Sequence, residues 1–207
     1  MSVSRLKRRH LEIALSRLRG HPSPSILLEQ YTIPADLAVK ILTLAAYKYD
    51  DIAGKVVFDL GCGTGRLAIG AALLGADYVV GLDIDRVALD VAKLNAYEAG
   101  VSDRVDWVLC DIAVFQSSCH TVLQNPPFGT RLRGADRVFL ERAMEMGRVV
   151  YTIHKSETDG FIRRFVEDHG GSISAVFKAM MTIPRVFPFH EKRVYRFEVY
   201  VYRIEVV

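Results

Sequence analysis

Cysteine is scarce in this sequence, and the spacing of the few cysteines argues against a disulfide framework. The 207 residues include three cysteines, Cys62, Cys110 and Cys119, which form no CxxC pair and cannot all pair with one another. Such usage is typical of a reducing compartment, because small secreted domains pair their cysteines and zinc sites space them closely. We therefore expect a cytoplasmic protein with no structural metal site in this chain.

Long hydrophobic runs and a strong excess of one charge are also absent. No apolar stretch reaches the ~18 residues that a membrane-spanning helix needs, so no membrane association is expected. The N-terminus is basic, but no apolar core and cleavage site follow it, which argues against a secretory signal. The net charge of +3 permits an RNA partner without requiring one. Half of the residues are hydrophobic, which suits a soluble globular domain with a full core.

Strand and helix patterns alternate along most of the chain and predict a doubly wound α/β fold. Residues 1–25 differ, because they are basic, and are expected to form a helix (5–19) and a linker ahead of a single domain at 26–207. In order, that domain is expected to contain helix 34–47, strand 55–60, helix 66–74, strand 78–82, helix 86–99, strands 104–110 and 120–124, helix 136–146, strand 148–153, helix 156–169, and strands 172–182 and 193–205. No helix separates the last two strands, so we expect a mostly parallel seven-stranded sheet with an antiparallel last strand.

Polar side chains mark the ends of successive predicted strands, where ligands bind in such sheets. They are Asp59, Asp83, Asp111 and Asn125. Directly after the first comes a glycine-rich turn, which consists of Gly61, Cys62, Gly63, Thr64 and Gly65. Glycine permits a positive φ and lets a ligand approach the backbone closely, and the N-terminus of the following helix can receive a polar ligand. We therefore expect a cofactor at this edge of the sheet.

The spacing of these residues favours S-adenosylmethionine (SAM) over a dinucleotide. Dinucleotide-binding turns follow the pattern G-x-G-x-x-G, whereas here the third glycine arrives one residue early. Asp83 could accept hydrogen bonds from both ribose hydroxyls, and Asp111 could accept one from an adenine amino group. Ile84 and Ile112 could enclose the adenine ring, while Asp59 could orient the turn or contact the methionine amine. The alternative is a tight turn with helix-capping aspartates and no ligand.

The segment Asn125-Pro126-Pro127-Phe128 predicts a rigid site for a planar amino group. A residue before proline is extended, and each proline has a fixed φ and no N–H donor. The Asn125 side-chain oxygen and the Pro126 carbonyl could therefore accept both hydrogens of one –NH2 group and stabilise its developing positive charge. Phe128 offers a face for a base, and such stacking is worth ~1–3 kcal/mol. The alternative is a proline loop with a core phenylalanine.

The combination of motifs resembles the methyltransferase-like protein 5 family in an archaeal form. The motifs are Glu29-Gln30-Tyr31, the segments 59–65, 81–85 and 125–130, His154-Lys155-Ser156, Phe189-His190 and Lys192. The resemblance implies a class I SAM-dependent methyltransferase that modifies N6 of an adenosine in RNA, with small-subunit ribosomal RNA as the expected substrate. It also implies Gln30 and Tyr31 as cofactor-lid residues. The family reads Glu-Gln-Tyr-x-Thr-Pro, whereas here Thr32 directly follows Tyr31, so only Gln30 and Tyr31 are carried over.

The resemblance further implies a small zinc-binding activator subunit of the tRNA-methyltransferase-112 type, paired along an edge strand. That strand would be 104–110, where Val105 and Trp107 alternate, because an uncovered apolar edge invites pairing. A tryptophan packed under a helix is the alternative.

Aromatic and basic residues outside the strand ends are candidates for RNA contact. We expect the acceptor side to include His154, Lys155, Phe189, His190 and Lys192. The basic helix at 5–19 could also contact phosphates. The alternatives are a structural histidine, a hairpin loop with solvated charges and an ordinary charged helix surface.

Other functions remain open on the sequence. A protein glutamine N5-methyltransferase would present the same planar –NH2 group to the Asn-Pro-Pro segment, although the fourth residue there tends to be tyrosine. A DNA adenine methyltransferase is disfavoured, because 207 residues leave no room for a target-recognition domain. A non-catalytic ribosome-assembly module is the alternative from another class, and the intact Asp83 and Asn125 argue against it.

Overall fold

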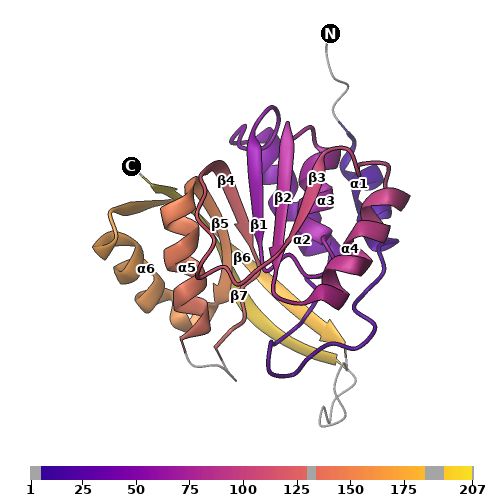
Figure 1. The fold of residues 1–207 in the computed structure, drawn as a ribbon. Coiled ribbons are helices and arrows are strands. Elements are labelled where there is room, and N and C mark those ends of the chain that lie inside the picture. Colours follow the sequence, from indigo (N-terminus) through magenta and orange to yellow (C-terminus); the bar gives the residue numbers. More distant parts are fainter. Residues whose placement is uncertain (1–5, 130–133, 185–193, 207) are drawn as a thin grey trace.

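Helices and strands alternate along the chain in the computed structural model, which describes residues 6–129, 134–184 and 194–206 (Figure 1). In chain order the elements are α1 (Arg8–Ser16), α2 (Ala35–Tyr47), β1 (Val56–Leu60), α3 (Arg66–Leu73), β2 (Tyr78–Asp83), α4 (Arg86–Glu98), β3 (Val105–Leu109), β4 (Cys119–Gln124), α5 (Ala135–Met146), β5 (Gly147–Lys155), the 3-10 helix η1 (Ser156–Thr158), α6 (Asp159–Asp168), β6 (Gly171–Pro184) and β7 (Val194–Val206). The predicted α/β order is confirmed, and most element boundaries differ by one to three residues. None of the described helices is both long and apolar enough to cross a bilayer.

The seven strands form one sheet in the order β3-β2-β1-β4-β5-β7-β6. Neighbours from β3 to β5 pair in parallel, whereas β7 is antiparallel to both β5 and β6. The antiparallel last strand is therefore confirmed, and it lies between β5 and β6. The strand order reverses between β1 and β4, and in such sheets a ligand binds beyond the carboxyl ends of the strands at this point.

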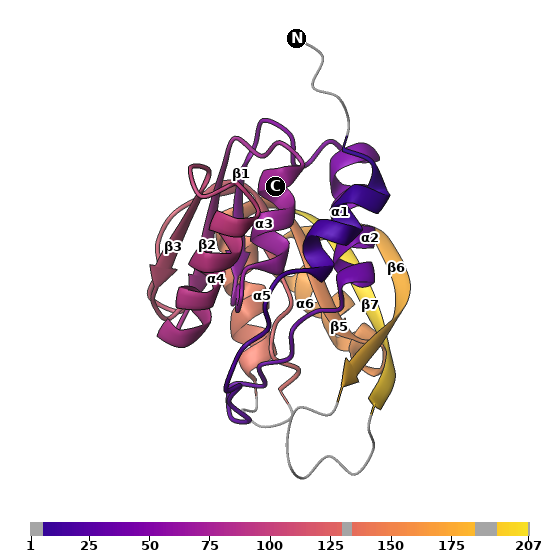
Figure 2. The same cartoon turned by 90° about the vertical axis from the view of Figure 1, so that its right-hand side faces the viewer.

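Helices cover the two faces of the sheet as separate layers (Figures 1 and 2). Alternating strand residues such as Val57 and Val79 pack with α2 and α3 on one face, and Phe58 and Val122 pack with α5 and α6 on the other. Helix α1 joins the first layer, because Leu11 is fully buried in the core that α2 and α3 form. A domain boundary at residue 25 stays a prediction.

One part of the sheet has no helical cover. Residues 110–118 connect β3 to β4 without a helix, and in Figure 1 they cross the front of the sheet as a loop. Parallel strands are usually connected through a helix that covers one face. Here Tyr78 is 37% exposed, and Val80 and Val108 are only half-buried on the side that this helix would cover.

Candidate active site at the carboxyl ends of the strands

A cavity of about 240 Å³ lies at the carboxyl ends of β1 to β4, and we call it the strand-end cavity. Its walls come from the glycine-rich turn, from the strand ends, from α5 and from residues 20–33, which we call the N-terminal strap. The lining residues are His21, Leu27, Leu28, Glu29, Gln30, Tyr31, Thr32, Ile33, Asp59, Gly61, Cys62, Gly63, Thr64, Arg66, Leu67, Asp83, Ile84, Cys110, Asp111, Ile112, Asn125, Pro127, Ala135 and Phe139.

The glycine-rich turn depends on a close approach that only glycine allows. Gly65 has a φ of +84°, and a Cβ there would meet the Trp107 ring at 2.4 Å. The indole therefore packs beneath the turn, against the start of α3 and Ala92 of α4. Trp107 thus packs under helices, which is the alternative that the sequence allowed for this residue. Its ring supports the glycine-rich turn. Gly65 itself does not line the strand-end cavity.

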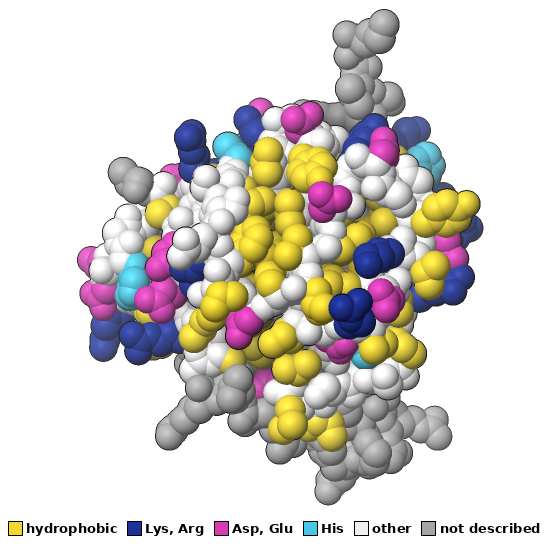
Figure 3. All heavy atoms as spheres, viewed as in Figure 1, with side chains coloured by type: hydrophobic (Ala, Val, Ile, Leu, Met, Phe, Trp, Pro, Cys, Tyr) yellow, Lys and Arg dark blue, Asp and Glu magenta, His cyan; other side chains and the backbone are white. Residues whose placement is uncertain are grey.

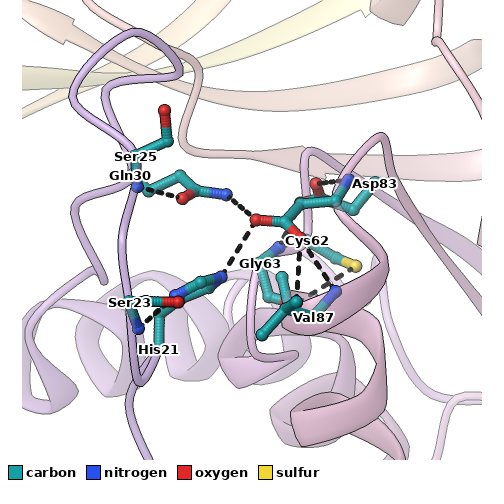
Figure 4. Close-up of polar contacts among 10 residues, drawn as sticks. His21, Ser23, Ser25, Gln30, Cys62, Gly63, Asp83 and Val87 are labelled. Carbon is teal, nitrogen blue, oxygen red and sulfur yellow. Dashed lines mark hydrogen bonds and ion pairs between the residues drawn. The ribbon is translucent and has the colours of Figure 1, made fainter.

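Asp83 fixes the turn and presents its carboxylate to the strand-end cavity. Its Oδ2 accepts a hydrogen bond from the Gly63 N–H at 2.7 Å, and its Oδ1 accepts one from the Asp85 N–H at 2.9 Å (Figure 4). Each carboxylate oxygen has a second lone pair, which leaves acceptors for a diol. Burial raises the pKa of Asp83, although these backbone hydrogen bonds oppose the shift.

Asp59 connects β1 to the first turn of α3. Its Oδ2 accepts a hydrogen bond from the Ala68 N–H at 2.9 Å, and the side chain is almost completely buried. Burial raises the pKa of Asp59 to about 8, so the carboxyl group is largely protonated at neutral pH in this state. A cationic group in the cavity would favour its ionised form.

The N-terminal strap is held at the cavity by a latch on Asp85. Gln30 Nε2 donates to Asp85 Oδ2 at 2.7 Å, and His21 Nε2 lies 3.0 Å from the same oxygen (Figure 4). Asp85 is also the N-cap of α4, because its Oδ1 accepts the Val87 N–H at 2.8 Å. Burial alone would raise the pKa of Asp85, but these hydrogen bonds outweigh it and lower the pKa. Gln30 therefore contributes to the cavity wall as a latch residue.

Asn125 presents an unused acceptor at the end of β4. Its Nδ2 donates to the Tyr31 carbonyl at 3.2 Å, while its Oδ1 is buried and has no hydrogen-bond partner. A buried acceptor without a partner is costly and marks a site at which a donor is expected to bind. This arrangement gives Asn125 an oxygen free to accept a hydrogen from an amino group.

A second cavity, the hairpin cavity, adjoins the acceptor segment 125–128 at Phe128. It has a volume of about 410 Å³ and is lined by Glu29, Tyr31, Phe128, Lys155, Ser156, Glu157, Ile183, Tyr195, Phe197 and Glu198. The Phe128 and Phe197 rings meet edge to face with centroids 5.4 Å apart, and Lys155 Nζ lies 5.9 Å from the Phe197 centroid. Glu29 and Tyr31 belong to both cavities, so the two cavities adjoin at the strap.

The structure gathers most of the predicted site residues around these two cavities. Every residue predicted to bind the cofactor lines the strand-end cavity except Gly65. In the acceptor segment, Asn125 and Pro127 line the strand-end cavity, Phe128 lines the hairpin cavity, and Pro126 lines neither.

The residues predicted to contact substrate are more dispersed. Lys155 lines the hairpin cavity, whereas His154 is 2% exposed, hydrogen-bonds to Thr152 at 2.8 Å and lines neither cavity. Burial lowers the pKa of His154 to about 3, so the imidazole is neutral and has a structural contact. Phe189, His190 and Lys192 lie outside the described residues.

Several wall residues are absent from the sequence-based set of site residues, among them Glu29, Arg66 and Phe139. Glu29 and Arg66 each stand next to a predicted residue, so their position along the chain is an available signal. Phe139 lies on α5, and its ring is within 2.8 Å of where a Gly61 Cβ would be. Nothing in the local sequence marks Phe139, because α5 reaches the turn only through the tertiary fold.

Comparison with known proteins gives matches along nearly the whole chain. The model for ribosomal protein L11 methyltransferase (PrmA) matches residues 40–125. The rRNA N(6)-adenosine-methyltransferase Mettl5 of Drosophila melanogaster is 37% identical over 99% of each chain, and that of Danio rerio is 38% identical over 91% of this chain and 93% of its own. A crystal structure of a Pyrococcus horikoshii protein, proposed to be an RNA methyltransferase, is 40% identical with a TM-score of 0.90, over 99% of this chain and 100% of that one. The chain therefore belongs to the methyltransferase-like protein 5 (METTL5) family of class I SAM-dependent methyltransferases.

Proposed function

We propose that this protein transfers a methyl group from SAM to N6 of an adenosine in ribosomal RNA. The observation that carries the proposal is the buried, unpartnered Oδ1 of Asn125, which lies where the strand-end cavity meets the acceptor segment. The named METTL5 relatives act on this atom of ribosomal RNA, and the chain aligns with them along almost its full length.

The strand-end cavity fits the chemistry of SAM. Asp83 offers carboxylate lone pairs for the ribose hydroxyls, and Ile84 and Ile112 offer apolar surface for the adenine ring. Ile84 is 56% exposed in this wall, so its apolar surface is accessible to a ligand. When bound, SAM supplies an electrophilic methyl group on a sulfonium.

The acceptor segment supplies the groups that an exocyclic amine needs. The lone pair of an adenine amine is delocalised into the ring, and an acceptor on each N–H favours its return to the nitrogen. Asn125 Oδ1 is one acceptor. The sequence pattern predicts the Pro126 carbonyl as the second, although Pro126 lines neither cavity in this structure. Phe128 and Phe197 provide an aromatic wall in the hairpin cavity for a base that has left its stack.

Small-subunit ribosomal RNA is the substrate that the family resemblance suggests. Lys155 contributes a cation to the hairpin cavity, and the expected role of this cation is to contact the RNA backbone. The choice of subunit rests on the resemblance alone, so the experiment must compare both subunits.

An activator subunit of the small zinc-binding type is the second part of the proposal. Strand β3 is an edge of the sheet, and Figure 3 shows hydrophobic side chains gathered in the middle of the view, over the β1–β2 part of the sheet. This uncovered face contains Val56, Tyr78, Val80 and Val108. A subunit that extends the sheet from β3 would cover both the free edge and this face.

Mass spectrometry of nucleosides tests the reaction. Purified protein is incubated with SAM and either small-subunit RNA, large-subunit RNA or ribosomal proteins. We expect N6-methyladenosine in the small-subunit RNA, and loss of about 10²–10³-fold in rate for Asn125→Ala, which is typical for removal of one preorganised polar group. SAM affinity should be nearly unchanged in this variant.

Methylation of another component would contradict the proposal. Methylated glutamine in the protein fraction would support the protein methyltransferase instead, and the PrmA match leaves this open because it ends at Asn125. N6-methyladenosine in large-subunit RNA alone would overturn the subunit assignment. SAM binding without any product would favour a non-catalytic assembly role.

A further inference from the structure

Arg66 is a cation in the wall of the strand-end cavity that is only partly used. It is the first residue of α3, directly after the glycine-rich turn. Its Nη1 donates to the Ile33 carbonyl of the N-terminal strap at 2.5 Å, while its Nε is buried without a hydrogen-bond partner. A guanidinium has five N–H donors, so most of its donor capacity is available to a ligand.

Among the residues that the structure describes, Arg66 has no counter-ion. Four carboxylates line the same cavity, Glu29, Asp59, Asp83 and Asp111, and within the described part of the chain none of them forms an ion pair with Arg66. Burial lowers the pKa of Arg66, and no nearby charge offsets that effect. Arg66 is half-buried, and a partly desolvated charge without a partner is unfavourable, so an anionic ligand would stabilise it there.

The cavity has two chemically different ends. At one end, Asp83 at the end of β2 and Asp111 after β3 lie next in sequence to Ile84 and Ile112. This combination of carboxylates and apolar side chains suits a nucleoside. Asp59 and Arg66 flank the turn after β1, next to Asn125 of β4. The amino-acid part of SAM carries an ammonium and a carboxylate. Carboxylate side chains can bind the ammonium, and the planar, donor-rich guanidinium of an arginine suits the carboxylate.

Arg66 is the sole Lys or Arg among the described residues that line this cavity. His21 is the other basic side chain of the wall, and its Nε2 already contacts Asp85. We propose that Arg66 binds the α-carboxylate of the cofactor and so selects SAM over forms that lack this group. The inference rests on SAM as the cofactor and does not depend on which nucleic acid or protein is methylated.

Calorimetry on the purified full chain, without RNA, tests the inference. The ligands are SAM, decarboxylated SAM, which lacks only the carboxylate, and 5′-methylthioadenosine, which lacks the whole amino-acid part. In Arg66→Met we expect SAM affinity to fall about 10- to 100-fold, the usual effect of losing hydrogen bonds to a charged group. The affinities for the two ligands without a carboxylate should change less than about threefold on the same scale.

Two further variants separate recognition from a structural role. Arg66→Lys keeps a cation and should recover part of the preference for SAM over decarboxylated SAM. Arg86→Met removes an exposed arginine at the start of α4, outside the cavity wall, and should leave all three affinities unchanged. An equal loss for all three ligands in Arg66→Met would overturn the inference, and so would unchanged SAM affinity. RNA methylation can fail independently, so the two proposals are tested separately.

Discussion

At the scale of single residues, Glu29 connects the cofactor side to the acceptor side. Its Oε2 accepts the Phe128 N–H at 2.9 Å, and its backbone has a φ of +48°, which is uncommon for a residue other than glycine. The side chain is 6% exposed and lines both cavities. We infer that this contact sets the direction of the acceptor segment relative to the N-terminal strap.

Removal of this contact should slow methyl transfer more than it weakens cofactor binding. For Glu29→Ala we expect kcat to fall about 10- to 100-fold, because small displacements of a reacting group have effects of this size. Glu29→Gln keeps an oxygen for the Phe128 N–H and should recover most of the rate. Steady-state kinetics and SAM calorimetry check this, and a matching loss of SAM affinity in Glu29→Ala would contradict a positioning role.

Asp59 should make the stability of the ligand-free protein depend on pH. Its pKa is raised from 3.8 to about 8 by burial, so the folded state holds a proton that the unfolded state releases. The contribution of Asp59 to stability is therefore complete below about pH 4 and is lost as the pH rises towards 8. Urea unfolding between pH 5 and 8 should show a smaller decline in Asp59→Asn, which keeps an acceptor for the Ala68 N–H. An identical decline in both proteins would refute this.

At the scale of elements, α1 is connected to the glycine-rich turn through one asparagine of α4. Asn95 is fully buried, its Oδ1 accepts the Arg19 N–H at 2.9 Å, and its Nδ2 donates to the carbonyls of Arg19 and Thr64 at 3.1 and 2.9 Å. Arg19, which follows α1, and Thr64 of the glycine-rich turn are thus both hydrogen-bonded to the Asn95 side chain.

Loss of this asparagine should destabilise the fold. Asn95→Ala leaves the buried Thr64 carbonyl and the part-buried Arg19 backbone groups without this partner, for which we expect a decrease of about 1–3 kcal/mol in the free energy of unfolding. Chemical denaturation measures it, with Lys93→Ala on the exposed side of α4 as the control. If the two variants were equally stable, the hydrogen bonds of Asn95 would not matter for the docking of α1.

At the scale of the whole molecule, buried polar contacts join distant parts of the chain near the start of β1, while the β1–β3 part of the sheet has one face without helical cover. Asp51 and Arg203 are 152 positions apart and form a buried ion pair at 2.8 Å before β1 and near the end of β7, away from the cavities. Tyr151 Oη also donates to Asp51 at 2.6 Å. These buried contacts join the segment before β1 to β5 and β7. The β1–β3 face, in contrast, exposes apolar side chains.

The open face should control assembly with the proposed activator subunit. Val108→Glu places a charge on it, and we expect the co-expressed subunit to be lost from the purified complex while SAM still binds, because burying an unpaired charge is costly. Tyr97→Glu changes a side chain on α4 that is 77% exposed and should leave the complex intact. Retention of the complex by Val108→Glu in size-exclusion chromatography would exclude this face as the interface.

The sequence by itself determined the order of the elements, the glycine-rich turn and the acceptor segment, because each is written in local periodicity or in adjacent residues. Asp83, Asp111 and Asn125 each follow or end a parallel strand, so their place at one edge of the sheet could be predicted before the strand order was known. Only the tertiary structure decided that Glu29 meets Phe128, that Trp107 supports Gly65 and that His154 is buried. Those contacts depend on which distant segments become neighbours and on which face each strand residue takes, and neither is encoded in a short stretch of chain.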